Sequence, residues 1–373
     1  MQVASMKETP NMKKLNLSLA ILAFAAMSVN AQTNSTNNAY SDPVGYVTVK
    51  MSAGSGTVKR LSYVSLPLLE KELSITGKSM GKITAVTATT ISDSSAGWVA
   101  GSLSAPATPY LLAITSGNAK GHIFHIASSA ATGGAVGASA SANTIDTITI
   151  SALTTGSGIS DLRTAGVAVG DDYALYACDT LSSALGSPST TGIFAAALPA
   201  SADTVVIVVN GTASTYWHNG TEWKKTGAGT PSSPNVPLLP YYGFSYSRIA
   251  NSELILTCTG SVPTQARKVQ LKNAGLSLLS QYFPVDTTLA TLALQNTAGW
   301  TKNALSPSAD KIVIVSSGTA STYWHNGTDW RKTGAGSPIS NTTVIPAGAM
   351  IYINKVGITS GFSTYSQVLP YTL

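Results

Sequence analysis

The sequence predicts an all-β protein made of tandem antiparallel β-sandwich or barrel-like modules, with internal repeats and very little helix. Charged residues make up only 10% of the 373 residues and hydrophobic ones 44%, which is too apolar for a disordered chain. Short runs rich in β-branched residues lie between clusters of Gly, Pro, Ser and Asn, and branched side chains pack well on a pleated sheet. One long segment also occurs twice, which indicates repeated modules.

The duplicated segment divides the chain. Residues 202–231 and 309–338 align at a constant offset of 107, and 23 of the 30 positions are identical. A weaker third copy is indicated near Trp98, where Ala-Gly-Trp precedes an apolar run as it does in the last copy. Self-similarity over a long period is typical of modules that pack alike. We therefore expect three β modules, the first of them degenerate, over residues 44–150, 165–262 and 266–373.

Each copy of the duplicated segment predicts a strand followed by a hairpin. The runs TVVIVV from Thr204 and KIVIV from Lys311 are short and β-branched, a pattern of strands buried on both faces. Asn219 and Asn326, each followed by Gly, predict a two-residue primed turn, because such a turn needs positive φ at both of its central positions. Aromatic residues flank both turns, so the sequence predicts two similar aromatic hairpins.

The amino terminus carries a predicted export signal. Two lysines precede the apolar stretch 15–29, and a small-residue cleavage site ends at Ala31. The stretch is shorter than the roughly 20 apolar residues that a spanning helix needs. We expect residues 1–31 to be a signal peptide, with residues 1–11 spurious because Met12 fits as the natural start. The chain is then secreted, extracellular or at the cell surface, with no transmembrane span.

A family resemblance is carried by several segments in the same order. They are DPVGYVTV from Asp42, VSLPL from Val64, GDDYALYACDTL from Gly170 and ADTVVIVV from Ala202, followed by the Tyr-Trp hairpin. The pattern resembles a little-studied family of secreted, β-rich bacterial proteins of unassigned function. The resemblance implies export, a bacterial source and a β-rich fold. It implies no functional residues.

Two cysteines, Cys178 and Cys258, lie in strand-like runs. In an oxidising compartment they could form a disulfide, and the alternative is a pair of buried free thiols. Sequence spacing does not decide between the two, because pairing depends on geometry.

The histidines and carboxylates do not predict a catalytic or metal site. His218 and His325 lie beside Glu222 and Asp329, but a hairpin with two candidate ligands falls short of the three or four that zinc needs. We expect these histidines to be solvated. No nucleophile elbow, phosphate loop or calcium repeat is present, so we expect no catalytic residue, metal or cofactor, and no enzyme activity.

The aromatic hairpins allow two interpretations. Exposed aromatic faces stack on sugar rings, which would make the hairpins a pair of carbohydrate-binding sites. Alternatively the same side chains complete the core of each module, because Trp and Tyr bury large areas. The candidate carbohydrate-binding residues are Tyr216, Trp217, Trp223, Tyr323, Trp324 and Trp330.

These observations favour a non-enzymatic extracellular structural or surface protein, such as a subunit of a layer, filament or matrix. Self-association through β edges is the expected contact, because unpaired strand edges template further pairing. The first alternative is a carbohydrate-binding adhesin with polysaccharide as its partner, and the second is a secreted hydrolase. The formal net charge of +6 is spread along the chain and does not predict nucleic-acid binding.

Overall fold

The structure is a computed structural model that describes residues 43–71, 77–99, 102–104, 109–128, 144–145, 147–150, 159, 161–209, 212–316, 318–357 and 360–372. The predicted signal peptide over 1–31 lies outside these residues. Among the described residues, 42% are in strands and 9% in helical turns, and the strands form several antiparallel sheets. The predicted all-β fold class is therefore confirmed.

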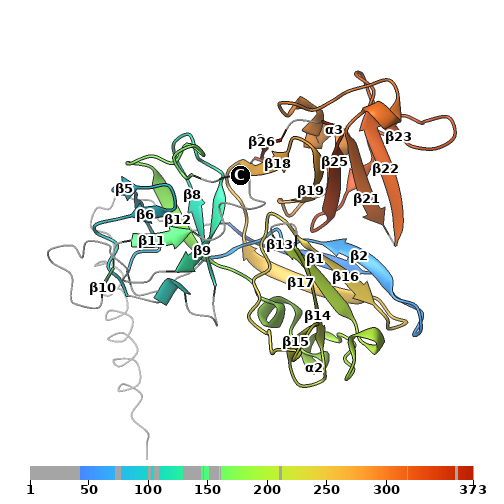
Figure 1. The fold of residues 1–373 in the computed structure, drawn as a ribbon, viewed down its shortest axis with the longest axis horizontal. Helices are drawn as coiled ribbons and strands as arrows, with labels where there is room; N and C mark the ends of the chain where they lie inside the picture. Colours follow the sequence, from blue (N-terminus) through green and yellow to red (C-terminus); the bar gives the residue numbers. More distant parts are fainter. Residues whose placement is uncertain are drawn as a thin grey trace, which may run out of the picture. The chain divides into compact units, whose positions relative to one another are not determined.

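One five-stranded sheet contains the first copy of the duplicated segment (Figure 1). Its order is β15-β14-β13-β16-β2. At the centre, Val205 and Ile207 of β13 are buried, whereas Val206 and Val208 on the other face are only half-buried. The sequence predicts that β13 is buried on both faces, but only one of its faces is fully buried. The strands are β2 (Arg60–Val64), β13 (Thr204–Val209), β14 (Thr212–His218), β15 (Trp223–Lys225) and β16 (Phe244–Arg248).

A second five-stranded sheet contains the other copy, in the order β19-β25-β21-β22-β23. Ile312 and Ile314 of its central strand point into the core, as Val205 and Ile207 do in the first sheet. A small pair, β20 (Thr287–Thr288) with β24 (Val344–Ile345), accompanies it. The five strands are β19 (Gly275–Ser280), β21 (Lys311–Ser316), β22 (Thr319–His325), β23 (Trp330–Lys332) and β25 (Met350–Lys355).

The largest sheet is formed by the part of the chain between β2 and β13. It has eight strands in the order β3-β12-β8-β9-β11-β6-β5, and β4 also pairs with β12. Separately, β7 (Trp98–Val99) pairs with β10 (Thr144–Ile145). The sheet strands are β3 (Glu70–Lys71), β4 (Met80–Lys82), β5 (Ala85–Val86), β6 (Thr90–Ser92), β8 (Tyr110–Ile114), β9 (Ile123–Ser128), β11 (Thr147–Ile150) and β12 (Asp172–Ala177).

Two antiparallel ribbons complete the set of sheets. β1 (Val44–Met51) pairs with β17 (Leu254–Ser261) along its whole length. β18 (Arg267–Lys272) pairs in the same way with β26 (Phe362–Gln367). Each ribbon turns alternate side chains toward a core, so its other face carries the more exposed residues.

The strand pairing divides the chain differently from the expected module boundaries. β1 and β2 pair with β17 and β16, so residues 44–64 share a core with residues 181–262 instead of belonging to a 44–150 module. The 70–177 part forms its own core around Trp98 and Tyr173, which extends past residue 150 to Leu175. A third core lies within residues 271–365, inside the expected 266–373 module. The core that contains the first hairpin is therefore built from two separate stretches of sequence, 44–64 and 181–262. The residues of the eight-stranded sheet lie between these stretches in the sequence.

The helical segments are short and lie between strands. None of the helices in the described part of the chain is long and apolar enough to cross a membrane. They are η1 (Ser102–Ser104), η2 (Leu181–Leu185), α2 (Pro188–Thr191), η3 (Pro199–Ser201), α3 (Leu289–Leu292), η4 (Leu294–Asn296) and η5 (Ser306–Ser308).

Candidate functional site

The two copies of the duplicated segment form hairpins with the same register. Thr204 pairs with Trp217 in one copy, and Lys311 pairs with Trp324 in the other. The return strands also match, since His218 pairs with Trp223 as His325 pairs with the corresponding Trp. Equivalent side chains therefore occupy equivalent places in the two sheets.

At the tip of each hairpin the Asn pairs across the turn: the N–H of Asn219 donates to Glu222 O at 3.1 Å, and that of Asn326 donates to Asp329 O at 3.0 Å. Two residues lie between the paired ones, but the predicted Asn-Gly pair is not the centre of the turn, because only its Gly has positive φ. The Asn219 side-chain oxygen accepts hydrogen bonds from the backbone N–H groups of Thr221 and Glu222, both at 2.9 Å. An Asn side chain that bonds its own following backbone stabilises a turn. Asn326 does the same in the second copy.

The two hairpin histidines are buried, so the expectation that they are solvated is wrong. The Nδ1 atom of His218 accepts a hydrogen bond of 3.1 Å from Gly220 N, and His325 accepts one of the same length from Gly327 N. Each imidazole also meets the adjacent Trp of its hairpin edge-on. Burial lowers the pKa of both histidines, which keeps Nδ1 free to accept. Their observed role is to hold the hairpin tip.

Metal ligation finds no support in the described residues. Within them, no group of three or more His, Cys, Asp or Glu side chains is arranged to hold a metal ion. His122 is buried and its ring stacks on Phe124, and burial lowers its pKa to about 4. Asp171 bonds the backbone N–H of Ala168 within a turn, and Asp172 forms an exposed ion pair with Lys82.

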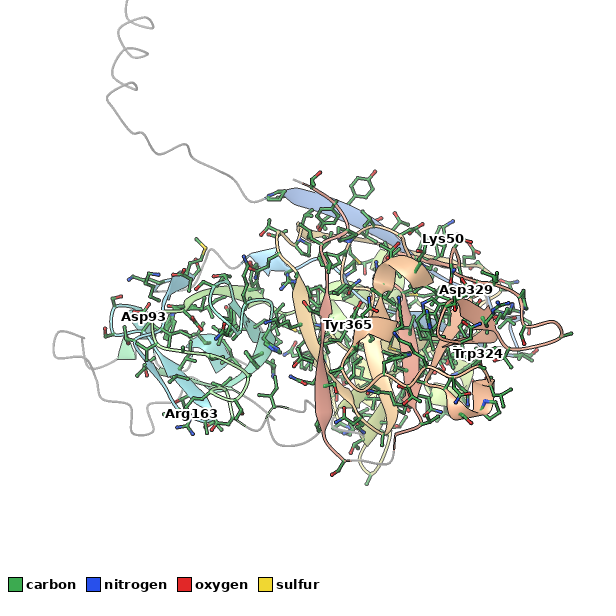
Figure 2. The ribbon with its side chains drawn as sticks, turned by 90° about the horizontal axis from the view of Figure 1, so that it is seen from above. Lys50, Asp93, Arg163, Trp324, Asp329 and Tyr365 are labelled. Carbon is green, nitrogen blue, oxygen red and sulfur yellow. The ribbon has the colours of Figure 1, made fainter. Side chains whose placement is uncertain are left out.

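All six candidate carbohydrate-binding residues are buried, so they do not form an exposed stacking platform. Tyr216 and Trp223 belong to the core of the first hairpin's unit, and Tyr323 and Trp330 belong to the corresponding core in the second. Trp217 and Trp324 lie on the opposite faces of their strands because neighbouring residues alternate, yet they too are covered. Figure 2 labels Trp324. The exposed fractions lie between 1% and 6% for Tyr216, Trp217, Trp223, Tyr323, Trp324 and Trp330.

A buried aspartate stands at the head of the central strand in the first hairpin sheet. The Asp203 carboxylate accepts hydrogen bonds from Arg248 at 2.7 Å and from the Tyr246 hydroxyl at 2.7 Å. It also accepts from the backbone N–H groups of Phe194 and Ile249 at 2.9 and 2.8 Å. A carboxylate with four donors is fully paired, which offsets the cost of its burial. The network joins three separate segments of chain.

The equivalent aspartate in the second sheet keeps only part of this network. Asp310 accepts from the backbone N–H groups of Thr301 and Val356, both at 2.8 Å. Lys355 stands in the place of Arg248, and Ile353 stands in the place of Tyr246. The Nζ atom of Lys355 is buried and has no hydrogen-bond partner. Sequence reasoning missed both aspartates, although the shared Ala-Asp pair before each strand is a usable signal.

The two cysteines are free thiols in the structure, so the disulfide alternative is not the one observed. Cys178 donates weak hydrogen bonds to the carbonyl oxygens of Asp179 and Leu238. Burial, together with the charge of Asp179, raises the pKa of Cys178 and raises that of Cys258 to about 12. Both thiols are therefore held in the protonated, unreactive form.

One cavity of about 420 Å³ lies beside β2 and the tip between β21 and β22. Two basic residues, Lys59 and Arg60, line it, but the Lys59 amine donates to Pro199 O at 2.6 Å and to Thr204 Oγ1 at 3.3 Å. The Lys59 amine thus links the segment before β2 to η3 and to the first residue of β13. This is a structural role.

The β1–β17 ribbon has an unpaired strand edge among the described strands. β1 pairs with β17 at one edge, and no described strand pairs with its other edge. Val44 and Tyr46 on its outer face are 77% and 73% exposed, whereas Val47 and Val49 face the core. Lys50, labelled in Figure 2, lies on the same outer face. In the second ribbon, β26 likewise pairs only with β18 among the described strands.

Comparison with known proteins finds no matching family model, no matching curated protein and no matching solved structure. The family resemblance carried by the sequence motifs therefore stays a prediction.

Proposed function

We propose that the chain is a non-enzymatic extracellular structural protein, a subunit of a layer, filament or matrix. Secretion rests on the export signal predicted in the sequence. The observation that carries the proposal is strand β1, which has eight residues, one unpaired edge among the described strands and a partly apolar outer face. Unpaired backbone N–H and C=O groups along such an edge template the addition of another strand.

The shared polar side chains of the hairpins support the same proposal. His218 and His325 are used to hold their own hairpin tips, and Asp203 is used to join three segments of its unit. Groups that are engaged in this way stabilise the fold and are turned away from solvent. This is the arrangement expected of a durable scaffold.

A second copy of this chain is the partner that we propose for β1. The complementary edge is that of β26 in the next subunit. In the first ribbon β17 takes a further neighbour at its second edge, through the bridge between Leu69 and Ser261, whereas β26 has no such neighbour among the described strands. Pairing of β1 with β26 is a head-to-tail contact, and a head-to-tail contact that does not close into a ring produces an open polymer.

The experiment is sedimentation velocity of the chain without residues 1–31 over a range of concentrations. We expect concentration-dependent association that Tyr46→Lys abolishes, because a charge then stands on the outer face beside the pairing edge. The matched control is Val169→Lys, at a residue that is 63% exposed and belongs to the turn before β12, not to the ribbon. A wild-type chain that stays monomeric at every concentration, or a control that impairs association equally, would contradict the proposal.

A further inference from the structure

The unpartnered lysine of the third core points to a covalent modification. Lys355 ends β25 and is 2% exposed, and its Nζ atom has no hydrogen-bond partner. A buried ammonium without a partner is unfavourable, so burial shifts a lysine toward the neutral amine. Burial lowers the pKa of Lys355 accordingly. A neutral lysine amine is a nucleophile.

A carboxamide borders the same small space beside Gly299 as this amine. Lys355 Nζ is 3.7 Å from the point that a Cβ atom on Gly299 would occupy, and Asn273 Oδ1 is 4.0 Å from the same point. The Ser363 hydroxyl, 3.6 Å from that point, donates to Asn273 Oδ1 at 2.6 Å and so fixes the amide. Because Gly299 has no side chain, no atom of this residue fills the space that the three groups border.

A buried carboxyl group acts electrostatically on the same amine. Asp310 is fully buried at the head of β21, and its charge acts on Lys355. Burial raises the pKa of Asp310, which favours its protonated form. A buried carboxylic acid can deliver a proton to a leaving group and take one from an attacking group.

The first sheet provides an internal comparison. There the equivalent of Lys355 is Arg248, whose guanidinium reaches Asp203, Gly192 O and Ser252. Gly192 is the equivalent of Gly299 at the offset of 107. A guanidinium is always protonated and is not an acyl acceptor. At the first site the basic side chain, Arg248, is therefore hydrogen-bonded. At the second site the basic side chain, Lys355, has no hydrogen-bond partner.

We propose that Lys355 and Asn273 become joined by an intramolecular isopeptide bond. Nζ of Lys355 attacks Cγ of Asn273, the Cγ–Nζ bond forms, and the Cγ–Nδ2 bond breaks. Asp310 relays the proton lost by the amine to the departing nitrogen, which leaves as ammonia. The exchange needs no oxidant, reductant or cofactor. It ties the turn between β18 and β19 to the end of β25, and it does not depend on the proposed self-association.

The test is mass spectrometry of the purified full chain. We expect the intact mass to fall by one ammonia molecule relative to the sequence of the same chain. We also expect trypsin to spare the bond after Lys355 and to release a branched peptide that links it to Asn273. Lys355→Met, Asn273→Ala and Asp310→Asn should each retain the ammonia, and the control Lys302→Met should still lose it.

The measurement does not depend on how well the variants fold, because the branched peptide is sought in the wild-type chain. Ordinary tryptic cleavage after Lys355 with no branched peptide would overturn the proposal. So would an ammonia loss that persists in Lys355→Met, because that loss would come from succinimide formation at an Asn-Gly pair such as Asn219-Gly220.

Discussion

The carboxylate of Asp203 accepts a hydrogen bond of 2.7 Å from the guanidinium of Arg248, and the two side chains are only 3% and 4% exposed. The pair joins the head of the central strand β13 to the end of its neighbour β16. Removing one member of such a pair leaves the other as a buried, uncompensated charge, which is more costly than losing a surface ion pair. The core around the first hairpin therefore depends on this contact.

Asp203→Ala should lower the free energy of unfolding by about 3–5 kcal/mol, because Arg248 would stay buried without its partner. The control is Asp172→Ala, which removes an exposed ion pair with Lys82 and should cost less than about 1 kcal/mol. Urea unfolding followed by tryptophan fluorescence measures both. Equal losses in the two variants would show that the buried pair has no special role.

Asn219→Ala should lower the free energy of unfolding by about 1 kcal/mol, because two backbone N–H groups at the hairpin tip lose their acceptor. Asn326→Ala should have a similar effect on the second hairpin. Asn354, exposed on β25, provides the control, and its replacement by Ala should change stability little. Thermal unfolding of the three variants measures this, and an unchanged midpoint in Asn219→Ala would contradict the stabilising role of the Asn219 side chain.

Acid should destabilise the chain through His122. Burial, and to a lesser degree the charge of Lys268, lowers its pKa from 6.5 to about 4. Between these values the unfolded chain binds a proton that the folded chain refuses, so stability falls as the pH drops through this window, by about 3 kcal/mol in total. His122→Gln should lose this component of the pH dependence. Urea unfolding from pH 7 to pH 4 tests it, and identical slopes in both proteins would exclude His122 as the cause.

Both cysteines should resist alkylation in the folded protein and react in denaturant. Raising the pKa of Cys258 from 9.0 to about 12 lowers its thiolate fraction at neutral pH about a thousandfold. Mass spectrometry after iodoacetamide treatment, with no reductant, counts the labelled thiols. Two labels in denaturant are expected from free thiols, and none would show that Cys178 and Cys258 are paired in the purified protein.

Individual strands and the hairpins could be predicted from the sequence, because they depend on residues that are close together in the chain. The β-branched run from Thr204 predicts a strand, and the aromatic segment after it predicts a hairpin, because each depends on neighbouring residues. The place of Asn219 in the turn was not predicted correctly, because its backbone pairs with Glu222 and its side chain accepts from the N–H groups that follow.

The partners of β1 and β2 could not be predicted, because they lie far along the chain. Val44–Met51 has the alternation of a half-buried strand, but that pattern does not say which strand it joins. The burial of Trp217 was equally hidden, since alternation alone places it on the outer face of β14. The buried aspartates went unrecognised because a single charged residue before a strand usually belongs to a solvated turn.

Electron microscopy of the purified chain without residues 1–31, at increasing protein concentration, tests the proposed structural role most directly. We expect ordered filaments or layers that are absent in Tyr46→Lys and retained in Val169→Lys. A wild-type chain that remains a dispersed monomer at the highest concentration would contradict the account.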